Sequence, residues 1–301
     1  MGRYLGLPLD DWNGPALARN SLMALIEAEA VDFSYPGGPV ALQQVSFAID
    51  PGEKIAILGA NGSGKSTLLK ILNGLLFPSS GAIRYRNKAL TEAALKDPEF
   101  FREFRSRVGF VFQNPDFQLF SPTVFEEVAF GPLQLGLGET EVRQRVADTL
   151  RLLRLEALAE RPPYQLSGGE KKRVAIASVL SMNPSVLLLD EPTLALDPRS
   201  RWELVDWLVE LHAAGKTLVI ATHDLEVAQV LSDRAIVLGE HQRLLRVGRT
   251  PEVLGDQALM EQANLIHVHR HRHADGWHRH PHSHLSGQSP HHEDGEGLKN
   301  R

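Results

Sequence analysis

Short hydrophobic runs alternate with polar turns along most of the chain, and two longer stretches have helical spacing instead. The first alternating run extends from Ala24 to Phe33 and predicts a strand, because every second residue is apolar. Further short strands are predicted up to about Arg86. The turn signals that separate them are Pro36-Gly37-Gly38, Asp50-Pro51-Gly52 and Ser79-Ser80-Gly81.

The two helical stretches interrupt this pattern at different places. Residues Lys65 to Leu76 carry leucines on one face at helical spacing, and residues Glu139 to Glu160 carry a similar apolar stripe that Pro162-Pro163 ends. Between them, residues 108–112 form a short apolar run that predicts a strand.

The second half of the chain alternates strands with helices. Strands are predicted at 186–190, 218–222 and 235–238, and helices at 171–182, 201–213 and 225–231. This alternation predicts a parallel sheet with helices on its faces. Beyond about Leu265 the periodicity stops and His, Gly, Pro, Ser and acidic residues dominate, which is typical of a disordered tail.

Composition narrows the class of protein. With 301 residues and 43% hydrophobic content, the chain has enough apolar side chains for a real core. The formal net charge of -5 provides no basic field, so nucleic acid is not an expected partner. The absence of cysteine excludes disulfides, iron–sulfur clusters and thiolate catalysis. No apolar run approaches the roughly 18 to 20 residues that span a bilayer, and residues 1–22 lack a secretory signal and are interpreted as an extension.

A glycine-rich segment follows the apolar run at 54–58 directly. Its sequence, GANGSGKST, fits the phosphate-binding pattern G-x-x-x-x-G-K-[ST] in the required context of strand, turn and helix. The glycines allow successive N–H groups to point at one anion at the positive end of a helix. Lys65 is expected to pair with the β- and γ-phosphates and Ser66 to bind Mg²⁺. The expected ATP-binding residues of this segment are Gly59, Ala60, Asn61, Gly62, Ser63, Gly64, Lys65, Ser66 and Thr67.

Two carboxylates and a histidine complete the expected catalytic edge. Asp190 and Glu191 end an apolar strand, where ligands bind in parallel α/β sheets. The first acid is expected near Mg²⁺ and the second is expected to activate the attacking water. His223 follows the strand predicted at 218–222, so we expect it at the same edge, in contact with the γ-phosphate.

A second anion-binding segment lies at Leu166-Ser167-Gly168-Gly169-Glu170, immediately before a predicted helix. A Ser-Gly-Gly turn at a helix N-terminus presents N–H groups and a partial positive charge to an anion. One chain therefore contains two segments suited to phosphate.

Together these motifs resemble the ATP-binding cassette (ABC) family over residues 24–262. GANGSGKST is similar to the Walker A motif, LSGGE to the signature, and VLLLDE to Walker B with Glu191 as its catalytic glutamate. The resemblance implies that Gln113 is the Q-loop glutamine and a Mg²⁺ ligand with Ser66 and Asp190. It also implies that His223 is the switch histidine. By the same resemblance, Asp197 belongs to the D-loop and Tyr35 stacks on adenine.

The family resemblance implies an α/β P-loop NTPase fold with a mixed, largely parallel core sheet. An N-terminal antiparallel β subdomain and an inserted helical subdomain at about 95–165 are expected. The ATPase domain is expected at 23–262, between the extension at 1–22 and a His-rich disordered tail at 263–301. In this family the signature of one cassette closes over the nucleotide held by another, so a homodimer or a heterodimer with a similar ATPase is implied. The signature residues are Ser167, Gly168, Gly169 and Glu170.

Within the family, residues 111–120, 123–131 and 167–177 resemble the ATPases of energy-coupling-factor importers. Those importers take up vitamins or cobalt and nickel ions through separate transmembrane subunits. The resemblance therefore implies a peripheral position on the cytoplasmic face of the cell membrane, with the apolar surface around Phe117 to Phe125 as the docking surface. Two residues depart from the family pattern. Glu170 replaces the more frequent Gln, as is common in this branch. Leu194 replaces a small D-loop residue, so hydrogen bonding across the dimer is expected to differ at that position.

Ten of the thirteen histidines lie beyond residue 266. Alternate residues of an extended chain share one side, and imidazoles with a pKa near 6.5 are mostly neutral at pH 7. Imidazole suits Ni²⁺, Cu²⁺, Zn²⁺ and Co²⁺, and affinity alone does not choose among them. The candidate ligands are His267, His269, His271, His273, His278, His280, His282 and His284.

These histidines favour cobalt or nickel as the imported solute, with a vitamin as the alternative. A soluble ABC ATPase for DNA repair or translation is a second alternative, although no sustained heptads occur between Lys65 and Ser167. The third alternative is a metal-storage protein whose ATPase activity is incidental.

Overall fold

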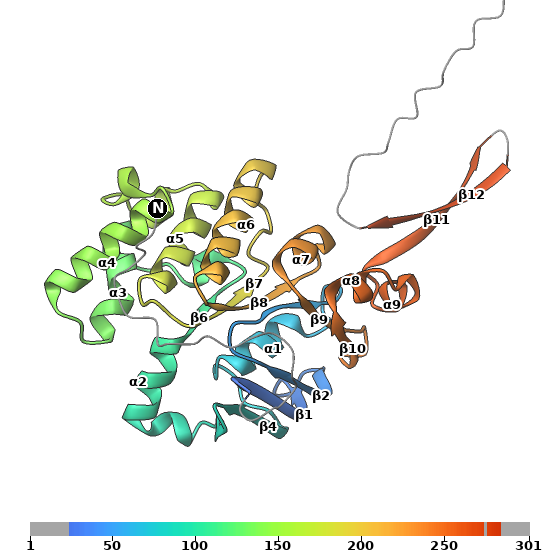
Figure 1. The fold of residues 1–301 in the computed structure, drawn as a ribbon, viewed down its shortest axis with the longest axis horizontal. Coiled ribbons are helices and arrows are strands. Elements are labelled where there is room, and N and C mark those ends of the chain that lie inside the picture. The colour runs from blue at the N-terminus through green and yellow to red at the C-terminus, as the bar shows by residue number, and fades with distance from the viewer. Residues whose placement is uncertain (1–23, 274–275, 284–301) are drawn as a thin grey trace, which may run out of the picture.

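The computed structural model describes residues 24–273 and 276–283, with side chains up to residue 266. The expected extension at 1–22 and the candidate ligand His284 lie outside the described residues. The described chain contains a six-stranded sheet, a four-stranded sheet and a two-stranded hairpin, with helices packed around the first two (Figure 1).

The six-stranded sheet is the centre of the molecule, and its strand order is β10-β9-β3-β8-β7-β6. All neighbouring pairs are parallel except β10 with β9. The strands are β3 (Lys54–Leu58), β6 (Val108–Val111), β7 (Val186–Asp190), β8 (Thr217–Thr222), β9 (Arg234–Leu238) and β10 (Leu244–Arg249). In β7, Val186 and Leu188 pack into one apolar cluster and Leu187 and Leu189 into another. Both faces are buried, which explains the continuous apolar runs.

The four-stranded sheet is antiparallel, with order β2-β1-β4-β5, as the expected fold class requires. Its strands are β1 (Ile26–Ser34), β2 (Val40–Ile49), β4 (Ser80–Tyr85) and β5 (Lys88–Ala89). The turn predicted at 79–81 is wrong, because β4 already begins at Ser80. Gly81 lies at an irregularity of the β1–β4 pairing with φ +81°, and a Cβ there would lie 2.2 Å from the Ala30 carbonyl oxygen.

Helix α1 (Lys65–Leu72) contributes to an apolar cluster that contains residues of both sheets. It ends four residues before the predicted Leu76, because the chain turns at Gly74 with φ +64°. Arg105 stabilises this end by donating to the carbonyl oxygens of Asn73 at 2.8 Å and Gly74 at 3.4 Å. Leu72, the last residue of the helix, is fully buried, whereas Leu75 lies beyond the helix end and is 43% exposed.

Four helices cover the other face of the core sheet and share the second apolar cluster with Val227 and Leu231 of a later helix. They are α3 (Val124–Gln134), α4 (Glu139–Leu152), α5 (Gly168–Leu180) and α6 (Pro198–Ala213). The helix predicted to reach Glu160 thus ends at Leu152, and α5 and α6 begin earlier than predicted because Ser167 and Asp197 cap them. Short 3₁₀ turns occupy Ala94–Lys96, Pro115–Phe117, Glu156–Leu158 and Pro163–Gln165.

The remaining helices are α7 (Leu225–Leu231), α8 (Thr250–Leu254) and α9 (Gln257–Gln262). All three contribute side chains to, or pack against, a third apolar cluster that includes Ala56 and Leu58 of β3. Among the described residues, no helix has both the length and the apolar character needed to cross a bilayer.

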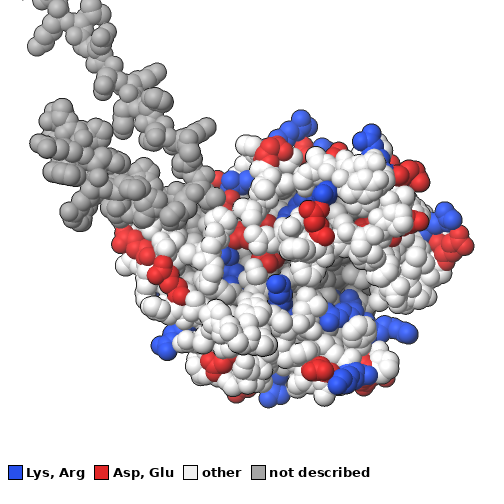
Figure 2. Space-filling view, turned by 180° about the vertical axis from the view of Figure 1, so that it is seen from behind, with Lys and Arg blue, Asp and Glu red and all other residues white. Residues whose placement is uncertain are grey.

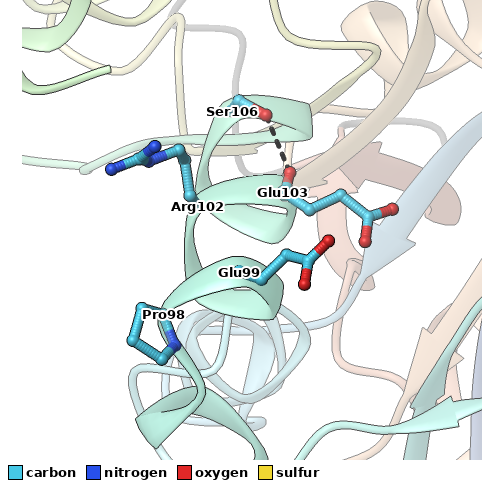
Figure 3. A pocket seen from close by; sticks show the side chains of 5 residues that line it. All are labelled: Pro98, Glu99, Arg102, Glu103 and Ser106. Atoms are coloured by element: carbon cyan, nitrogen blue, oxygen red, sulfur yellow. Dashed lines mark hydrogen bonds between the residues drawn. The ribbon is translucent and has the colours of Figure 1, made fainter. Parts of the chain in front are cut away.

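Helix α2 (Pro98–Arg107) was not predicted, although Asp97-Pro98 is a recognisable helix start. Its Phe104 ring packs edge-on against Tyr85 of the antiparallel sheet, with centroids 5.1 Å apart. The range 95–165 is therefore not one helical subdomain, because α2 packs with the antiparallel sheet and β6 belongs to the core sheet. An open hollow runs along α2 beside Glu99, Arg102 and Glu103, but none of its lining residues is buried (Figure 3).

Strands β11 (Ile266–His273) and β12 (Gly276–Ser283) pair as an antiparallel hairpin that projects from the end of the molecule near α9 (Figure 1). We expected no regular structure beyond residue 262, but alternating His and non-His residues have the period of a strand. The pairing register sets His267 opposite His282, His269 opposite His280, and His271 opposite His278.

The different burial of two leucines on one predicted helix face gives a stability test. Leu72→Ala should lower the free energy of unfolding by about 2 to 5 kcal/mol, because it opens a cavity in the core. Leu75→Ala should change it by less than about 1 kcal/mol, because that side chain is largely in water. Urea denaturation followed by circular dichroism measures both. Equal losses would show that packing of α1 extends to Leu75.

Candidate functional site

Four neighbouring parallel strands end at one edge of the core sheet. The register pairs Leu58 with Thr222, Asp190 with Ala221, and Val111 with Leu189. The residues that follow these strand ends are the glycine-rich loop, Glu191, His223 and the segment containing Gln113. The strand register therefore places all of the predicted catalytic segments at this edge.

The loop at 59–67 has the backbone that its glycines allow. Gly62 and Gly64 have φ of +83° and +101°, in the left-handed region that favours glycine. A Cβ on Gly64 would lie 2.4 Å from the Ala41 carbonyl oxygen, and one on Gly59 would lie 2.3 Å from Ser63 Oγ. Ser63 Oγ is buried and has no hydrogen-bond partner among the described residues. This unpaired polar atom in a ring of glycines is consistent with a loop shaped for an anion.

Lys65 carries a buried positive charge into the loop. Its Nζ atom donates to the carbonyl oxygens of Gly59 at 2.7 Å and Ala60 at 3.1 Å, and lies 3.5 Å from Glu191 Oε1. Burial lowers the pKa of Lys65, and the Glu191 carboxylate opposes this shift. The ammonium group is thus held between the loop and the second acid.

Ser66 and Asp190 are already in contact. The Ser66 hydroxyl donates to Asp190 Oδ1 at 2.9 Å, and Asp190 is buried. Burial raises the pKa of Asp190, partly offset by the Ser66 hydrogen bond. A hydroxyl and a carboxylate side by side are oxygen ligands of the kind that Mg²⁺ prefers, so this pair fits the expected ion. Gln113 lies at the end of β6 and is exposed, and its side chain forms no hydrogen bond within the described residues.

Glu191 and His223 are also in direct contact at this edge. His223 Nδ1 lies 2.8 Å from Glu191 Oε1, and this hydrogen bond raises the pKa of His223. The histidine therefore keeps its proton to a higher pH than a free imidazole does. Glu191 has φ +44°, an uncommon value for a residue with a side chain.

Tyr35 connects the antiparallel sheet to the loop helix. Its hydroxyl lies 3.0 Å from Thr67 Oγ1, and its ring packs edge-on against Phe33 with centroids 5.0 Å apart. The side chain remains 38% exposed beside the phosphate loop. The ring is thus positioned next to the loop, with part of its surface free to contact a base.

The signature forms a complete helix cap. Ser167 Oγ accepts from the Glu170 N–H at 3.3 Å, while Glu170 Oε2 accepts from the Ser167 N–H and hydroxyl, both at 2.8 Å. These bonds lower the pKa of Glu170. Among the described residues, no hydrogen bond or ion pair joins 167–170 to 59–67. Asp197 likewise caps its own helix, by accepting from the N–H groups of Arg199 and Ser200.

Lys172 is a buried charge that the sequence reasoning missed. It is 3% exposed, and its Nζ atom donates to the Gln113 carbonyl oxygen at 2.6 Å. Burial lowers its pKa to about 8. The signal was available, because Lys172 shares a helix face with the apolar residues Ala175, Ile176 and Val179.

Charge on the rest of the surface is mixed. Figure 2 shows acidic and basic side chains interspersed on one face of the molecule, without a continuous basic field. Among the residues whose side chains the structure describes, no group of three or more His, Asp and Glu is placed to hold a metal ion. The side chains of the His-rich hairpin are not among those that the structure describes.

Known proteins are similar to this chain in sequence and in fold. Residues 42–194 match the family described as ABC transporter. An ABC transporter ATP-binding protein of Methanosarcina acetivorans, for which no solute is named, is 51% identical over 83% of this chain and 91% of its own length. The nickel import protein NikO and the cobalt import protein CbiO of Rhodobacter capsulatus are each 48% identical over 80% of this chain. These matches cover 95% and 84% of those two proteins.

Solved structures agree. The structure of cbiO1 from Clostridium perfringens, part of the ABC transporter complex cbiONQ, superposes with a TM-score of 0.68 at 40% identity. That match covers 81% of this chain and 95% of cbiO1. A dimeric ATP-binding cassette with bound ADP and Pi superposes with a TM-score of 0.68 at 34% identity, over 75% of this chain and 98% of the cassette. The chain belongs to the ABC transporter family, as an ATP-hydrolysing ATP-binding protein of the energy-coupling-factor type.

Proposed function

We propose that the chain is the ATPase subunit of an importer for nickel or cobalt ions. Its ATPase role is carried by one observation, the meeting of Lys65, the Ser66–Asp190 pair and the Glu191–His223 pair at one sheet edge. The similarity to NikO and CbiO supports the metal solute, whereas a vitamin remains the alternative.

The residues of the edge divide the reaction between them. Lys65 and the N–H groups of residues 59–67 bind the triphosphate. Ser66, Asp190 and Gln113 would hold Mg²⁺, which neutralises charge on the phosphate oxygens when bound. Glu191 accepts a proton from the attacking water, and His223 contacts the γ-phosphate. Tyr35 stacks on the adenine.

A second cassette completes the site. Within the described part of the chain, residues 167–170 form hydrogen bonds only within their own helix and its cap. In the proposed dimer, Ser167, Gly168 and Gly169 serve the nucleotide of a partner. A dimeric solved cassette supports this arrangement. The two cassettes are either identical or similar, and Asp197 at the start of α6 would belong to the D-loop at their interface.

An exposed aromatic patch is the proposed docking surface for the transmembrane subunits. It consists of Phe117, Phe120, Phe130 and Leu133, of which Phe117 is 80% and Phe120 67% exposed. The Phe120 and Phe130 rings pack edge-on 4.9 Å apart. Buried Glu127 holds the loop in place by accepting from the Phe120 and Ser121 N–H groups. A patch of this kind marks an interaction site, and it would place the chain at the cytoplasmic face of the membrane.

This patch differs from the surface expected around Phe117 to Phe125. Phe125 packs against the second apolar cluster and does not contribute to the patch. The exposed side chains Phe130 and Leu133 of α3 take its place.

Replacing the proposed general base tests the ATPase and the transport role together. Glu191→Gln should still bind Mg·ATP in a calorimeter but lose turnover by about two orders of magnitude or more, because it cannot accept the proton. Cells that carry this variant should take up radiolabelled Ni²⁺ and Co²⁺ no faster than cells without the protein.

The wild-type protein is the positive control in the same cells. Near-normal hydrolysis by Glu191→Gln would remove Glu191 from its role. Normal hydrolysis by the wild type without metal uptake would leave the ATPase intact and favour a vitamin as the solute.

Removing one aromatic ring tests the docking surface. Phe120→Ala should reduce the fraction of protein that sediments with membranes of its host by roughly tenfold. Its ATPase activity in solution should stay within about twofold of wild type, because the patch lies outside the nucleotide site. The matched control is Phe101→Ala, which removes a 45% exposed ring on α2. Equal losses for both variants would contradict a specific docking role.

We also propose that the hairpin binds transition-metal ions. The backbone register pairs His267 with His282, His269 with His280 and His271 with His278. Alternate residues of a strand belong to the same face, so this register is the basis of the proposal. Directly opposed residues have Cβ atoms roughly 4.5 to 5.5 Å apart, a separation that two ligands of one ion can bridge. His273 pairs with Gly276 and has no histidine opposite it.

Calorimetric titration with NiCl₂ tests the hairpin. The triple variant His267→Ala, His269→Ala, His271→Ala should bind Ni²⁺ at least about tenfold more weakly, because each pair loses one ligand. Arg270→Ala with Arg272→Ala changes the intervening residues of the same strand and should leave affinity unchanged. Wild-type binding should fade below about pH 6, when imidazole protonates. Equal affinity of the triple variant and wild type would exclude this site.

Deleting residues 266–301 separates import from storage. ATPase activity and metal uptake that survive this deletion would make the hairpin an accessory to transport. If the deletion variant no longer binds metal ions but still supports normal metal uptake, the hairpin is likewise an accessory to transport.

A further inference from the structure

Lys172 has a charge that the catalytic roles described above do not use. It lies in the first turns of α5, the helix that Ser167 caps, and it is 3% exposed. A buried ammonium group is costly unless acceptors surround it. Its acceptors are two consecutive backbone carbonyls of the segment that follows β6, Gln113 at 2.6 Å and Phe112 at 3.4 Å.

Two other side chains join the same segment to α5. Lys171 Nζ lies 2.7 Å from Asp116 Oδ1. Gln118 Nε2 donates to the Ala175 carbonyl oxygen at 2.6 Å and to Ser178 Oγ at 3.0 Å, while Gln118 Oε1 accepts from the Phe112 N–H. Residues 112–118 are therefore attached to α5 along three successive turns of the helix.

Of these contacts, only that of Lys172 comes from a buried side chain and acts on Gln113 itself. Asp116 is 60% exposed in its ion pair, so that bond is screened by water. The Gln113 side chain forms no hydrogen bond within the described residues, so the contact with its backbone carbonyl is what fixes its position.

We propose that Lys172 is a positioning residue that holds Gln113 and Ser167 in one rigid unit. Gln113 belongs to the nucleotide site of its own chain, and Ser167 serves the site of the partner chain. Because Lys172 joins the segment that carries Gln113 to the helix that Ser167 caps, a movement of one nucleotide site is transmitted to the other. This inference rests on the proposed roles of Gln113 and Ser167.

Lys216 provides a matched comparison within the molecule. Its Nζ atom also donates to two oxygens, the side chain of Asn183 and the carbonyl of Pro184, each at 2.7 Å. Burial lowers its pKa to about 8, as for Lys172. Its acceptors lie in the turn before β7, away from the catalytic edge. Removing Lys216 therefore reports what the loss of such a lysine does to stability alone.

The test compares Lys172→Met, Lys172→Arg and Lys216→Met. Lys172→Met should lower kcat by roughly 10- to 100-fold, the scale of an ångström-sized misplacement, with KM for Mg·ATP within about threefold, because the phosphate loop is unchanged. Lys172→Arg keeps the donors and should restore most of kcat. Lys216→Met should leave kcat within about twofold, whatever its effect on melting temperature.

Hydrogen exchange of residues 112–118 provides a second measurement that does not depend on catalysis. These amides should exchange faster in Lys172→Met than in wild type or Lys216→Met, and should regain protection in Lys172→Arg. If Lys172→Met does not fold, Lys172→Gln is measured instead, because it keeps one donor group without the charge.

Unchanged kcat in Lys172→Met, or unchanged exchange at 112–118, would overturn the proposal. Equal losses of kcat in Lys172→Met and Lys216→Met would also overturn it, by showing a purely structural role. A wild-type protein that fails to hydrolyse ATP would count against the proposed function instead, and the exchange measurement would still decide the role of Lys172.

Discussion

Burial of the core sheet on both faces is the constraint on which the site depends. Alternate residues of β7 enter two different apolar clusters, so a shift of one residue would exchange the two faces and disrupt the packing of both. The register of β6, β7, β8 and β3 is fixed in this way. The loops that follow these strands then have to begin at one edge, because parallel strands end on the same side.

Charges at that edge are balanced within a small volume. Lys65 and Lys172 are buried cations, and Asp190 and Glu191 are buried acids. The hydrogen bond from Glu191 raises the pKa of His223. Each group has a neighbour that offsets part of the cost of removing it from water. The loop glycines make this possible, since a side chain on Gly59 would collide with Ser63 Oγ and one on Gly64 with the Ala41 carbonyl oxygen. Function at the edge thus relies on backbone shape as much as on charged residues.

Much of this arrangement could be predicted from the sequence, and the reasons are local. The phosphate loop lies between a strand and a helix as its motif requires, and the apolar runs before Asp190 and His223 are buried strands. Helix α2 escaped prediction because only Phe100 and Phe104 of its ten residues are buried, which is too sparse a stripe to recognise. The hairpin was interpreted as disorder because its composition is polar, although its alternation has the period of a strand. Contacts such as Lys172 with Gln113 join residues 59 apart and follow only from the packing of α5.

The backbone at Glu191 has a consequence for which residues this position can accept. Two consecutive acids in a regular strand would point to opposite faces of the sheet. Here the strand ends at Asp190, and the left-handed φ of +44° at the next residue lets Asp190 meet Ser66 while Glu191 meets Lys65 and His223. Two adjacent residues of the sequence thereby contact different partners at one edge of the sheet. Valine or isoleucine would disfavour this positive φ because their side chains are branched at Cβ. The backbone conformation therefore restricts which residues can occupy position 191, in addition to the need for an acid.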